Sequence, residues 1–451
     1  MTRNRSPATM RRDSHTAWWI AAVGGLLAAW LRWYFVTHAQ VLQPLDIVQV
    51  RGDAVDYYRY AWNLAHHGIF SSAVPGTPAP QADSFRDPGY PLFLAGLMLI
   101  FPNYGSWYAA ALLTQAALGG ITVACLVLAF RRALPPWLLG VVAIMTAAWP
   151  HLVSVSAYVL SENLLLMLMA SLLLAVGEAA ERPRPARWLC AGIVFALAGL
   201  TNAVVAPLVV PVALVLRWKR AVSGRQAAAL LLAALIPLAA WSLRNASLSA
   251  DASSSYRAEQ NLVQGSWPIY HQAYQLSARG DADGVRAMSD INGEINLLHA
   301  APRQGLRAMA ERMSAQPWTY VRWYLSKPAT LWGWDILMGQ GDIYVYPTRN
   351  SPYMTQPLLK GVENLAFLLN PLLAVLALAG LAMALARRTT PAAVITAAVS
   401  AAWVTLVYAT LQSEPRYAIP FRGIEIALAC FAMAQGAAWW RHRQRSPGNA
   451  T

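Results

Sequence analysis

Long apolar stretches, separated by short basic connections, dominate the hydrophobic pattern of this chain. Most of them are about 20 residues long, which is the length at which a helix crosses the roughly 30 Å hydrocarbon core of a bilayer. The pattern predicts an all-α polytopic membrane protein with about ten transmembrane helices. The predicted spans lie near residues 17–37, 107–130, 135–152, 160–180, 187–202, 203–217, 226–245, 361–386, 391–411 and 417–440.

Composition supports this class and changes how the charge is interpreted. Hydrophobic residues make up 57% of the chain and charged residues only 12%, whereas soluble proteins carry about 25% charged residues. Lys and Arg number 35 against 21 Asp and Glu, which leaves a net charge of +14. In a soluble protein that excess would suggest a nucleic-acid partner. Here the basic residues flank apolar spans and fix orientation, so we expect membrane lipids as partners and no nucleic acid.

The basic residues also predict the topology. With the N-terminus inside, the short internal connections collect arginines such as Arg131 and Arg132, as the positive-inside rule requires. The first apolar stretch lacks a cleavage site and is expected to stay as the first span. The predicted organisation comprises a cytoplasmic N-terminus (1–16), a membrane domain (17–245) with a first extracytoplasmic loop (38–106), an extracytoplasmic loop region (246–360), C-terminal transmembrane helices (361–440) and a cytoplasmic tail (441–451).

Three segments do not fit the simple pattern of full spans. The stretch 88–102 is too short to cross and begins and ends in proline, and we interpret it as a helix in the outer interface. If it crossed, Arg131 and Arg132 would lie outside. The stretch 187–217 is short for two spans and is expected to form a tight or partly re-entrant hairpin. Helical spacing of apolar residues predicts several short helices in the predicted extracytoplasmic region 246–360, called the second outer region, one of them over 284–315.

The acidic pair Asp53 and Asp56, in the loop after the first span, is the first candidate for chemistry. A helix is expected from Ala54, with Asp53 at its N-cap, and both carboxylates could simply stabilise that helix end. Alternatively, Asp53 is held just above the membrane and accepts a proton from an acceptor hydroxyl. The two interpretations are compatible, because a cap would also orient the carboxylate.

Two arginines near the outer boundary are the next candidates. Arg86 stands before the stretch 88–102, where it could reach the lipid headgroups or bind a lipid phosphate or a sugar. Arg416 approaches an apolar helix with Glu414 beside it, and the two could form an ion pair. In the functional interpretation Arg416 stabilises a departing lipid phosphate, a role that suits its planar set of donors. Ionisable groups at that depth are costly and usually face a cavity, which favours function.

Other polar residues at span ends are weaker candidates. Glu162 follows Ser161 at the start of one predicted span, and Arg244 precedes Asn245 at the end of another. Each could line a cavity or anchor its span. The residues alone indicate no metal site, because the histidines lack the spacing of metal ligands.

Five motifs, taken in chain order, carry a family resemblance. They are GD…Y…A..L..G (Gly52 to Gly68), R-x-PGYPLFLA (Arg86 to Ala95), Ser161-Glu162, W-x-x-RN (Trp241 to Asn245) and EPRYAIP (Glu414 to Pro420). In order and topology the chain resembles the GT-C superfamily of membrane glycosyltransferases. It is most similar to the bacterial relatives of protein mannosyltransferases and aminoarabinose transferases, which are glycosyltransferase family 39-like.

The resemblance implies a multi-pass enzyme of the bacterial inner membrane with an extracytoplasmic active site. It implies a polyprenyl-phosphate-linked sugar as donor and a lipid, glycan or protein as acceptor. Asp53 maps onto the catalytic acid of the family. Ala54 stands where many relatives carry a second acid, so the need for a divalent cation stays open. The expected substrate-binding residues are Arg86, Arg416, Asp56, Glu162, Arg244 and Glu414.

Two other functions stay open at this point. An O-antigen ligase or polymerase would also have many spans and a large outer loop, but it would depend on arginines rather than on Asp53. A transporter would need a polar path at the midplane of the bilayer. The charged candidates cluster at the outer boundary instead, which argues against transport.

Overall fold

The computed structural model describes residues 7–45, 52–248 and 253–444 and is almost entirely helical. The first part of the chain contains α1 (Pro7–His38), α2 (Asp53–His67), α3 (Gly89–Ile100), α4 (Tyr104–Phe130), α5 (Pro136–Ala148), α6 (Pro150–Ser154), η1 (Val155–Ala157), α7 (Glu162–Glu181), α8 (Pro185–Thr201), η2 (Ala206–Leu208), α9 (Val209–Trp218) and α10 (Gly224–Ala246). The second part contains α11 (Ser254–Gly265), α12 (Tyr270–Ala278), α13 (Ala282–Ala300), α14 (Pro302–Ala315), α15 (Pro317–Leu331), α16 (Pro352–Thr355), α17 (Pro357–Ala386), α18 (Ala392–Thr410), α19 (Pro415–Ala418), η4 (Ile419–Phe421) and α20 (Arg422–Gln444). The short strands β1 (Gln40–Val41) and β2 (Thr348–Arg349) pair antiparallel.

In the described part of the chain, seven helical stretches are long and apolar enough to cross a membrane, or eight if α5 and the stretch Pro150–Ala157 count as one bent span. The seven are α1 from His15, α4, α7, α10, α17, α18 and the stretch Pro415–Arg441. The prediction of an all-α polytopic membrane protein is therefore confirmed. A count of about ten would also require the shorter apolar helices α8 and Ala206–Trp218 to cross, and it stays a prediction.

Prolines set the breaks in the apolar segments. Trp149, between α5 and α6, has an extended conformation (φ −61°, ψ 121°), because the residue before a proline is pushed out of the helical region. The two helices consequently differ in direction by 54°. In the second outer region the single helix predicted over 284–315 is wrong. Pro302 starts α14 after a break at Ala301, as proline commonly does at a first helical position.

The segment 88–102 forms the short helix α3. It has 12 residues, which at 1.5 Å per residue gives a length of about 18 Å, well below the roughly 30 Å hydrocarbon core. A side-chain Cβ built on Gly89, its first residue, would lie 2.9 Å from the Thr201 Cα at the end of α8. Glycine therefore lets the start of α3 pack directly on α8. The side of the membrane on which α3 lies stays a prediction.

Small residues allow the membrane helices to pack closely. A Cβ on Gly120 of α4 would lie 2.7 Å from the carbonyl oxygen of Gly25 in α1, so only glycine permits this backbone approach. Interfaces between membrane helices commonly use small residues in this way. This contact lets the backbones of α1 and α4 pack directly against each other.

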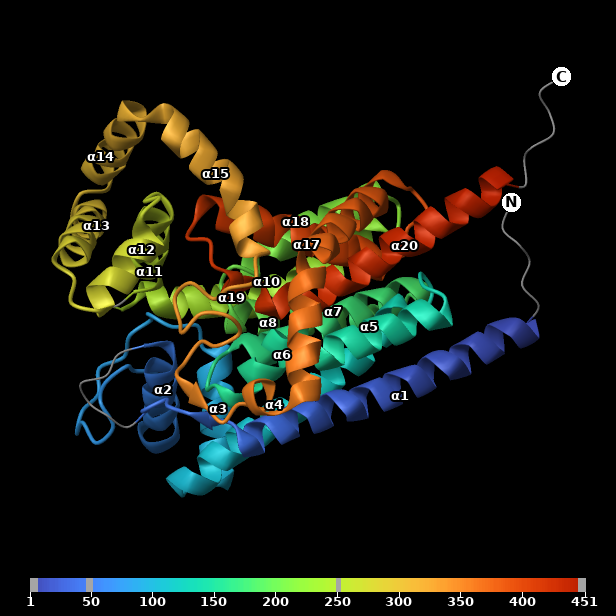
Figure 1. Cartoon of the computed structure of the whole chain (residues 1–451), viewed down its shortest axis with the longest axis horizontal. Coiled ribbons are helices and arrows are strands. Elements are labelled where there is room, and N and C mark those ends of the chain that lie inside the picture. Colours follow the sequence, from blue (N-terminus) through green and yellow to red (C-terminus); the bar gives the residue numbers. More distant parts are fainter. Residues whose placement is uncertain (1–6, 46–51, 249–252, 445–451) are drawn as a thin grey trace.

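Helices of the two segments predicted to be extracytoplasmic, 38–106 and 246–360, gather at one end of the molecule. In Figure 1, α2, α3 and α11–α14 lie at the left, whereas α1 and α20 extend to the right. Helices α11–α14 have a small core of their own, which includes Val263, Ile291 and Leu298. The β1–β2 pairing ties the end of α1 to the loop before α16. The first loop, the second outer region and this connecting loop therefore meet at the same end.

Candidate active site

Asp53 is the first residue of α2, and its carboxylate does not cap the helix. The N-cap is Gly52, which makes no side-chain cap hydrogen bond and has φ 147°, a backbone conformation that favours glycine. The Asp56 backbone N–H donates to the Gly52 carbonyl. The expectation that Asp53 caps this helix is therefore wrong, and its carboxylate is available for other partners.

Arg86 joins the two aspartates of α2. Its Nη2 lies 2.7 Å from Asp53 Oδ1 and 2.6 Å from Asp56 Oδ2, and its Nε donates to the same Asp56 oxygen at 3.0 Å. The guanidinium also lies 5.5 Å from the ring centre of Tyr57. Asp56 thus holds Arg86 through two donors and fixes the plane in which it faces Asp53.

Arg416 approaches Asp53 from the C-terminal part of the chain. Its Nη2 lies 2.7 Å from Asp53 Oδ2, and its Nε donates to Glu162 Oε1 at 2.6 Å. Arg416 belongs to α19 and Glu162 is the first residue of α7. Asp53, Asp56, Arg86, Glu162 and Arg416, here called the Asp53 network, therefore bring four separate segments together.

Three carboxylates and two guanidiniums make up this network. The Asp53 side chain is 31% exposed, whereas the side chains of Arg86, Arg416 and Glu162 are 12%, 13% and 9% exposed. Asp53 is thus the most accessible of these groups. Burial raises the pKa of the Asp53 carboxyl, but Arg86 and Arg416 outweigh burial and hold this pKa well below its usual range. Burial raises the pKa of Asp56 above its usual value despite the opposing charge of Arg86.

Two tyrosines and one glutamine connect the Asp53 network to α3, α4 and α7. The Tyr57 hydroxyl lies 3.1 Å from Ser161 Oγ, which ties α2 to the start of α7. Tyr90 of α3 packs edge-on against Tyr57 and donates to Gln115 of α4 at 2.8 Å. Tyr57 and Tyr90 both lie in the motifs that carried the family resemblance. Gln115 lies in none, and a buried amide inside an apolar span was the only sequence signal for it.

Glu414 is not the ion-pair partner of Arg416. Its carboxylate accepts hydrogen bonds from the backbone N–H groups of Leu337 at 3.1 Å and Met338 at 3.4 Å. Burial, partly offset by these donors and by Arg416, raises the pKa of Glu414 to about 7. Glu414 therefore holds the loop before β2 against the turn that leads to Arg416, and it lies outside the Asp53 network.

Arg244, at the end of α10, also lies outside the network. It donates to the backbone carbonyl of Asp83 at 2.5 Å and stacks over Trp241, with 4.8 Å to the ring centre. Asp83 in turn accepts from the backbone N–H and hydroxyl of Ser72, each at 2.7 Å. Arg244 thus holds the first outer loop against the end of α10. Asp83, which connects that loop to Arg244, is not among the residues selected from the sequence.

The second outer region contacts the first beside the hairpin of α8 and α9. Arg257 of α11 pairs with both oxygens of Asp87 at 2.8 Å, and Asp87 accepts from the backbone N–H of Ala203 at 3.2 Å. Asp87 follows Arg86 directly in sequence. The same short turn therefore supplies a guanidinium to the network and a carboxylate to the second outer region.

The Asp53 network does not fit a divalent cation. Both oxygens of Asp53 are already bonded to guanidinium groups. Across the part of the chain that the structure describes, no three His, Cys, Asp or Glu side chains are grouped so that they could hold a metal ion. The chemistry proposed for these residues therefore uses no metal ion.

Comparison with known proteins relates one part of this chain to a family. Residues 84–243 match the family model for dolichyl-phosphate-mannose-protein mannosyltransferases. No curated protein matches the sequence at a significant level. The apo oligosaccharyltransferase of Archaeoglobus fulgidus aligns with 96% of this chain and 52% of its own, at 14% identity and a TM-score of 0.49. The same archaeal enzyme, AglB, in complex with an inhibitory peptide and a dolichol-phosphate, covers the same shares at 13% identity and a TM-score of 0.45. This chain spans about half the length of these structures.

The matched segment includes Arg86, Glu162 and Arg244 from the predicted site. Asp53 and Arg416 lie outside it and reach it through the ion pairs described above. The match also coincides with several of the membrane helices. The family match thus confirms the resemblance of this chain to the GT-C superfamily of membrane glycosyltransferases.

Proposed function

We propose that this chain transfers a sugar from a polyprenyl-phosphate-linked donor to a hydroxyl of a lipid, glycan or protein acceptor, at the extracytoplasmic face of a bacterial inner membrane. The observation that carries the proposal is that Arg86 and Arg416 both bind the half-buried carboxylate of Asp53. Guanidinium groups bind phosphate through charge-assisted hydrogen bonds. The network therefore combines a carboxylate base with two groups suited to a phosphate.

Donor binding activates Asp53 in this proposal. Without donor, the two arginines depress the pKa of Asp53, and a carboxylate of low pKa is a weak general base. A donor phosphate carries negative charge and competes with Asp53 for the same guanidinium donors. As Arg416 turns toward the phosphate, the pKa of Asp53 rises and the carboxylate becomes a better proton acceptor.

The reaction is a displacement at the anomeric carbon of the sugar. The acceptor hydroxyl gives its proton to Asp53 while its oxygen forms a bond to the anomeric carbon. The bond from this carbon to the phosphate oxygen breaks, and the polyprenyl phosphate leaves with the electron pair. Arg416, with Arg86, stabilises the negative charge on the leaving phosphate. Glu162 and Asp56 act as positioning residues because each orients one of the arginines.

The second outer region supplies the acceptor side of the proposal. Helices α11–α14 stand at the same end of the molecule as α2 (Figure 1). The ion pair of Arg257 with Asp87 connects this region to the turn that carries Arg86. We assign acceptor selection to this region and the donor site to the membrane domain.

A transfer assay tests the proposed activity. Membranes containing the chain are incubated with a panel of radiolabelled polyprenyl-phosphate sugars, and incorporation into lipid, glycan and protein fractions is measured. The expected result is chain-dependent incorporation from a lipid-linked donor, with none from the matching nucleotide sugar. Incorporation that requires the nucleotide sugar would contradict the donor assignment. Membranes with an Arg416→Lys variant serve as the control for chain-dependent chemistry.

An O-antigen ligase-type enzyme is the alternative, and Asp53 discriminates between the two. Such an enzyme would keep its activity without the Asp53 carboxylate, whereas the proposed mechanism would lose it. The arginines of the Asp53 network serve both alternatives, so arginine variants alone do not separate them.

A further inference from the structure

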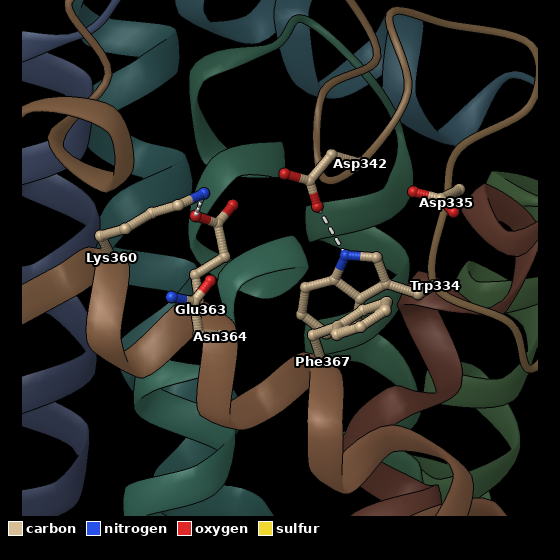
Figure 2. A pocket seen from close by; sticks show the side chains of 7 residues that line it. All are labelled: Trp334, Asp335, Asp342, Lys360, Glu363, Asn364 and Phe367. Carbon is tan, nitrogen blue, oxygen red and sulfur yellow. Dashed lines mark hydrogen bonds and ion pairs between the residues drawn. The ribbon is translucent and has the colours of Figure 1, made fainter.

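A polar cavity lies at the start of α17, apart from the Asp53 network. It has a volume of about 280 Å³ and is lined by side chains from the loop after α15 and from the first turns of α17. Figure 2 shows Asp342 and Trp334 of the loop facing Lys360, Glu363 and Phe367 of the helix. None of the lining residues belongs to the Asp53 network, so the proposed mechanism leaves this cavity unused.

A buried carboxylate in this cavity lacks a donor for one oxygen. Glu363 is 3% exposed, and its Oε2 pairs with Lys360 Nζ at 2.7 Å. Its Oε1 is buried and has no hydrogen-bond partner among the described residues. Figure 2 shows this carboxylate on the side of the cavity that faces Asp342, whose Oδ1 accepts from Trp334 Nε1 at 2.5 Å. Because an unpaired buried carboxylate oxygen is costly, the site favours a positively charged hydrogen-bond donor.

A larger apolar cavity adjoins the polar one. It has a volume of about 650 Å³, lies between α15, α17, α18 and α20, and shares Trp334 and Phe367 with the polar cavity. This volume falls within the range of about 300–1,000 Å³ seen for small-molecule sites. Its wall on α17 includes Leu368, Val375 and Leu378, which are 72%, 65% and 66% exposed. On a membrane-spanning helix such side chains face lipid, so the apolar cavity borders the acyl chains of the bilayer.

We propose that the joined cavities bind one aminophospholipid of the outer leaflet. Its ammonium lies between Glu363 and Asp342, its phosphate contacts Lys360, and an acyl chain enters the apolar cavity. An ammonium carries three donors and can bind both carboxylates. The Lys360 side chain is 49% exposed, so it can reach a phosphate at the rim. The two carboxylates and the lysine thus offer a partner to each charge of a zwitterionic headgroup.

The aromatic pair at the junction suits the same ligand. Trp334 and Phe367 contact edge-on, with ring centres 5.6 Å apart, and they line both cavities. Aromatic rings with one polar and one apolar neighbour are favoured at the headgroup level of membranes. Within the described chain no group of three acidic, His or Cys side chains could hold a metal ion, which favours an ammonium over a metal cation. This inference rests on membrane insertion and does not require the proposed transferase activity.

Native mass spectrometry of the purified full chain tests the proposal. The protein is titrated with phosphatidylethanolamine or with phosphatidylglycerol of the same acyl chains, and the bound fraction is measured. The wild type should bind phosphatidylethanolamine at least about tenfold more tightly than phosphatidylglycerol, because hydrogen bonds to charged groups are stronger than those between neutral groups. Phosphatidylcholine keeps the charge but lacks N–H donors, so it should bind more weakly than phosphatidylethanolamine. Equal binding of all three lipids would overturn the proposal, and this comparison needs no variant.

Variants then locate the site. Glu363→Gln and Asp342→Asn should each reduce the preference for phosphatidylethanolamine, and together they should abolish it. Glu311→Gln changes a carboxylate that is 64% exposed on α14 and should keep the full preference. An undiminished preference in the double variant would overturn the assignment. Tighter binding of polyprenyl phosphate than of phosphatidylethanolamine would make the cavity part of the donor site and would also overturn it.

Discussion

Arg416 Nη2 lies 2.7 Å from Asp53 Oδ2, although the two residues belong to opposite ends of the chain. The same guanidinium donates through Nε to Glu162 at 2.6 Å. Arg416 is therefore held by two carboxylates at once, which requires its planar fork of donors. This relationship links the first outer loop to the last membrane helices and is the basis of the first two predictions.

The first prediction is that Arg416→Lys lowers sugar transfer by about 100-fold, comparable to the loss of one oxyanion donor. Lysine keeps the positive charge but cannot bind Asp53 and Glu162 in one plane. Protein level and insertion should stay normal. Transfer per folded molecule in purified membranes measures the effect, and wild-type activity in Arg416→Lys would reduce this arginine to an anchor.

Glu162→Gln should reduce transfer by about tenfold, because it removes one of the two charges that orient Arg416. The matched control is Glu178→Gln, at the other end of α7, where Glu178 pairs with Arg131. The control should change transfer by no more than about twofold. Equal losses in the two variants would point to general destabilisation of α7 and against a positioning role for Glu162.

The raised pKa of Glu414 predicts that the free energy of unfolding depends on pH. Its pKa is raised to about 7 by burial, above the value of about 4.3 for an unfolded chain. The folded state therefore holds an extra proton between about pH 4.5 and 7, and stability falls as pH rises through this window. His271 is the titratable group facing Glu414, at 4.0 Å, and burial lowers its pKa to about 4, so it is neutral there.

Glu414→Gln mimics the protonated form and should flatten that dependence. Thermal unfolding in detergent at pH 5, 6, 7 and 8 measures it. The stability of the wild type relative to Glu414→Gln should fall by about 1–3 kcal/mol between pH 5 and pH 8. Parallel curves for the two proteins would show that Glu414 does not titrate in this range.

The predicted topology depends on α3 not crossing the membrane. If α3 lies in the outer interface, Asn103 is extracytoplasmic and Arg132, after α4, is cytoplasmic. Cysteine labelling with a membrane-impermeant reagent should therefore modify Asn103→Cys in intact cells and Arg132→Cys only after lysis. Labelling of both positions from the same side would contradict the predicted topology.

Sequence patterns were sufficient for the fold class and for selecting residues that the structure brings together in the Asp53 network. Long apolar stretches identify membrane helices because the bilayer sets their length. Acidic and basic residues next to such stretches stand out, so Asp53, Asp56, Arg86, Glu162 and Arg416 could all be selected. Proline explains why the single helix predicted over 284–315 is wrong, because the apolar spacing continues across Pro302 while the backbone breaks there.

The partners within the site could not be predicted. Glu414 and Arg416 are neighbours in sequence, but residues two apart do not face each other on a helix, and Arg416 instead pairs with Asp53 and Glu162. The start of α2 was placed one residue late, because the unusual φ of Gly52 moves the N-cap. Contacts between distant segments leave no local pattern, which is why the Asp53 network appears only in the folded chain.

The central claim is that the Asp53 carboxylate accepts the proton of the acceptor. The decisive measurement is sugar transfer per folded molecule for Asp53→Asn, with Asp56→Asn as its control on the same helix. Asp53→Asn removes the base and should reduce transfer by a factor on the order of 100 or more. Asp56→Asn loosens Arg86 and should cost about tenfold or less. Full activity in Asp53→Asn would contradict the account and favour an arginine-dependent ligase.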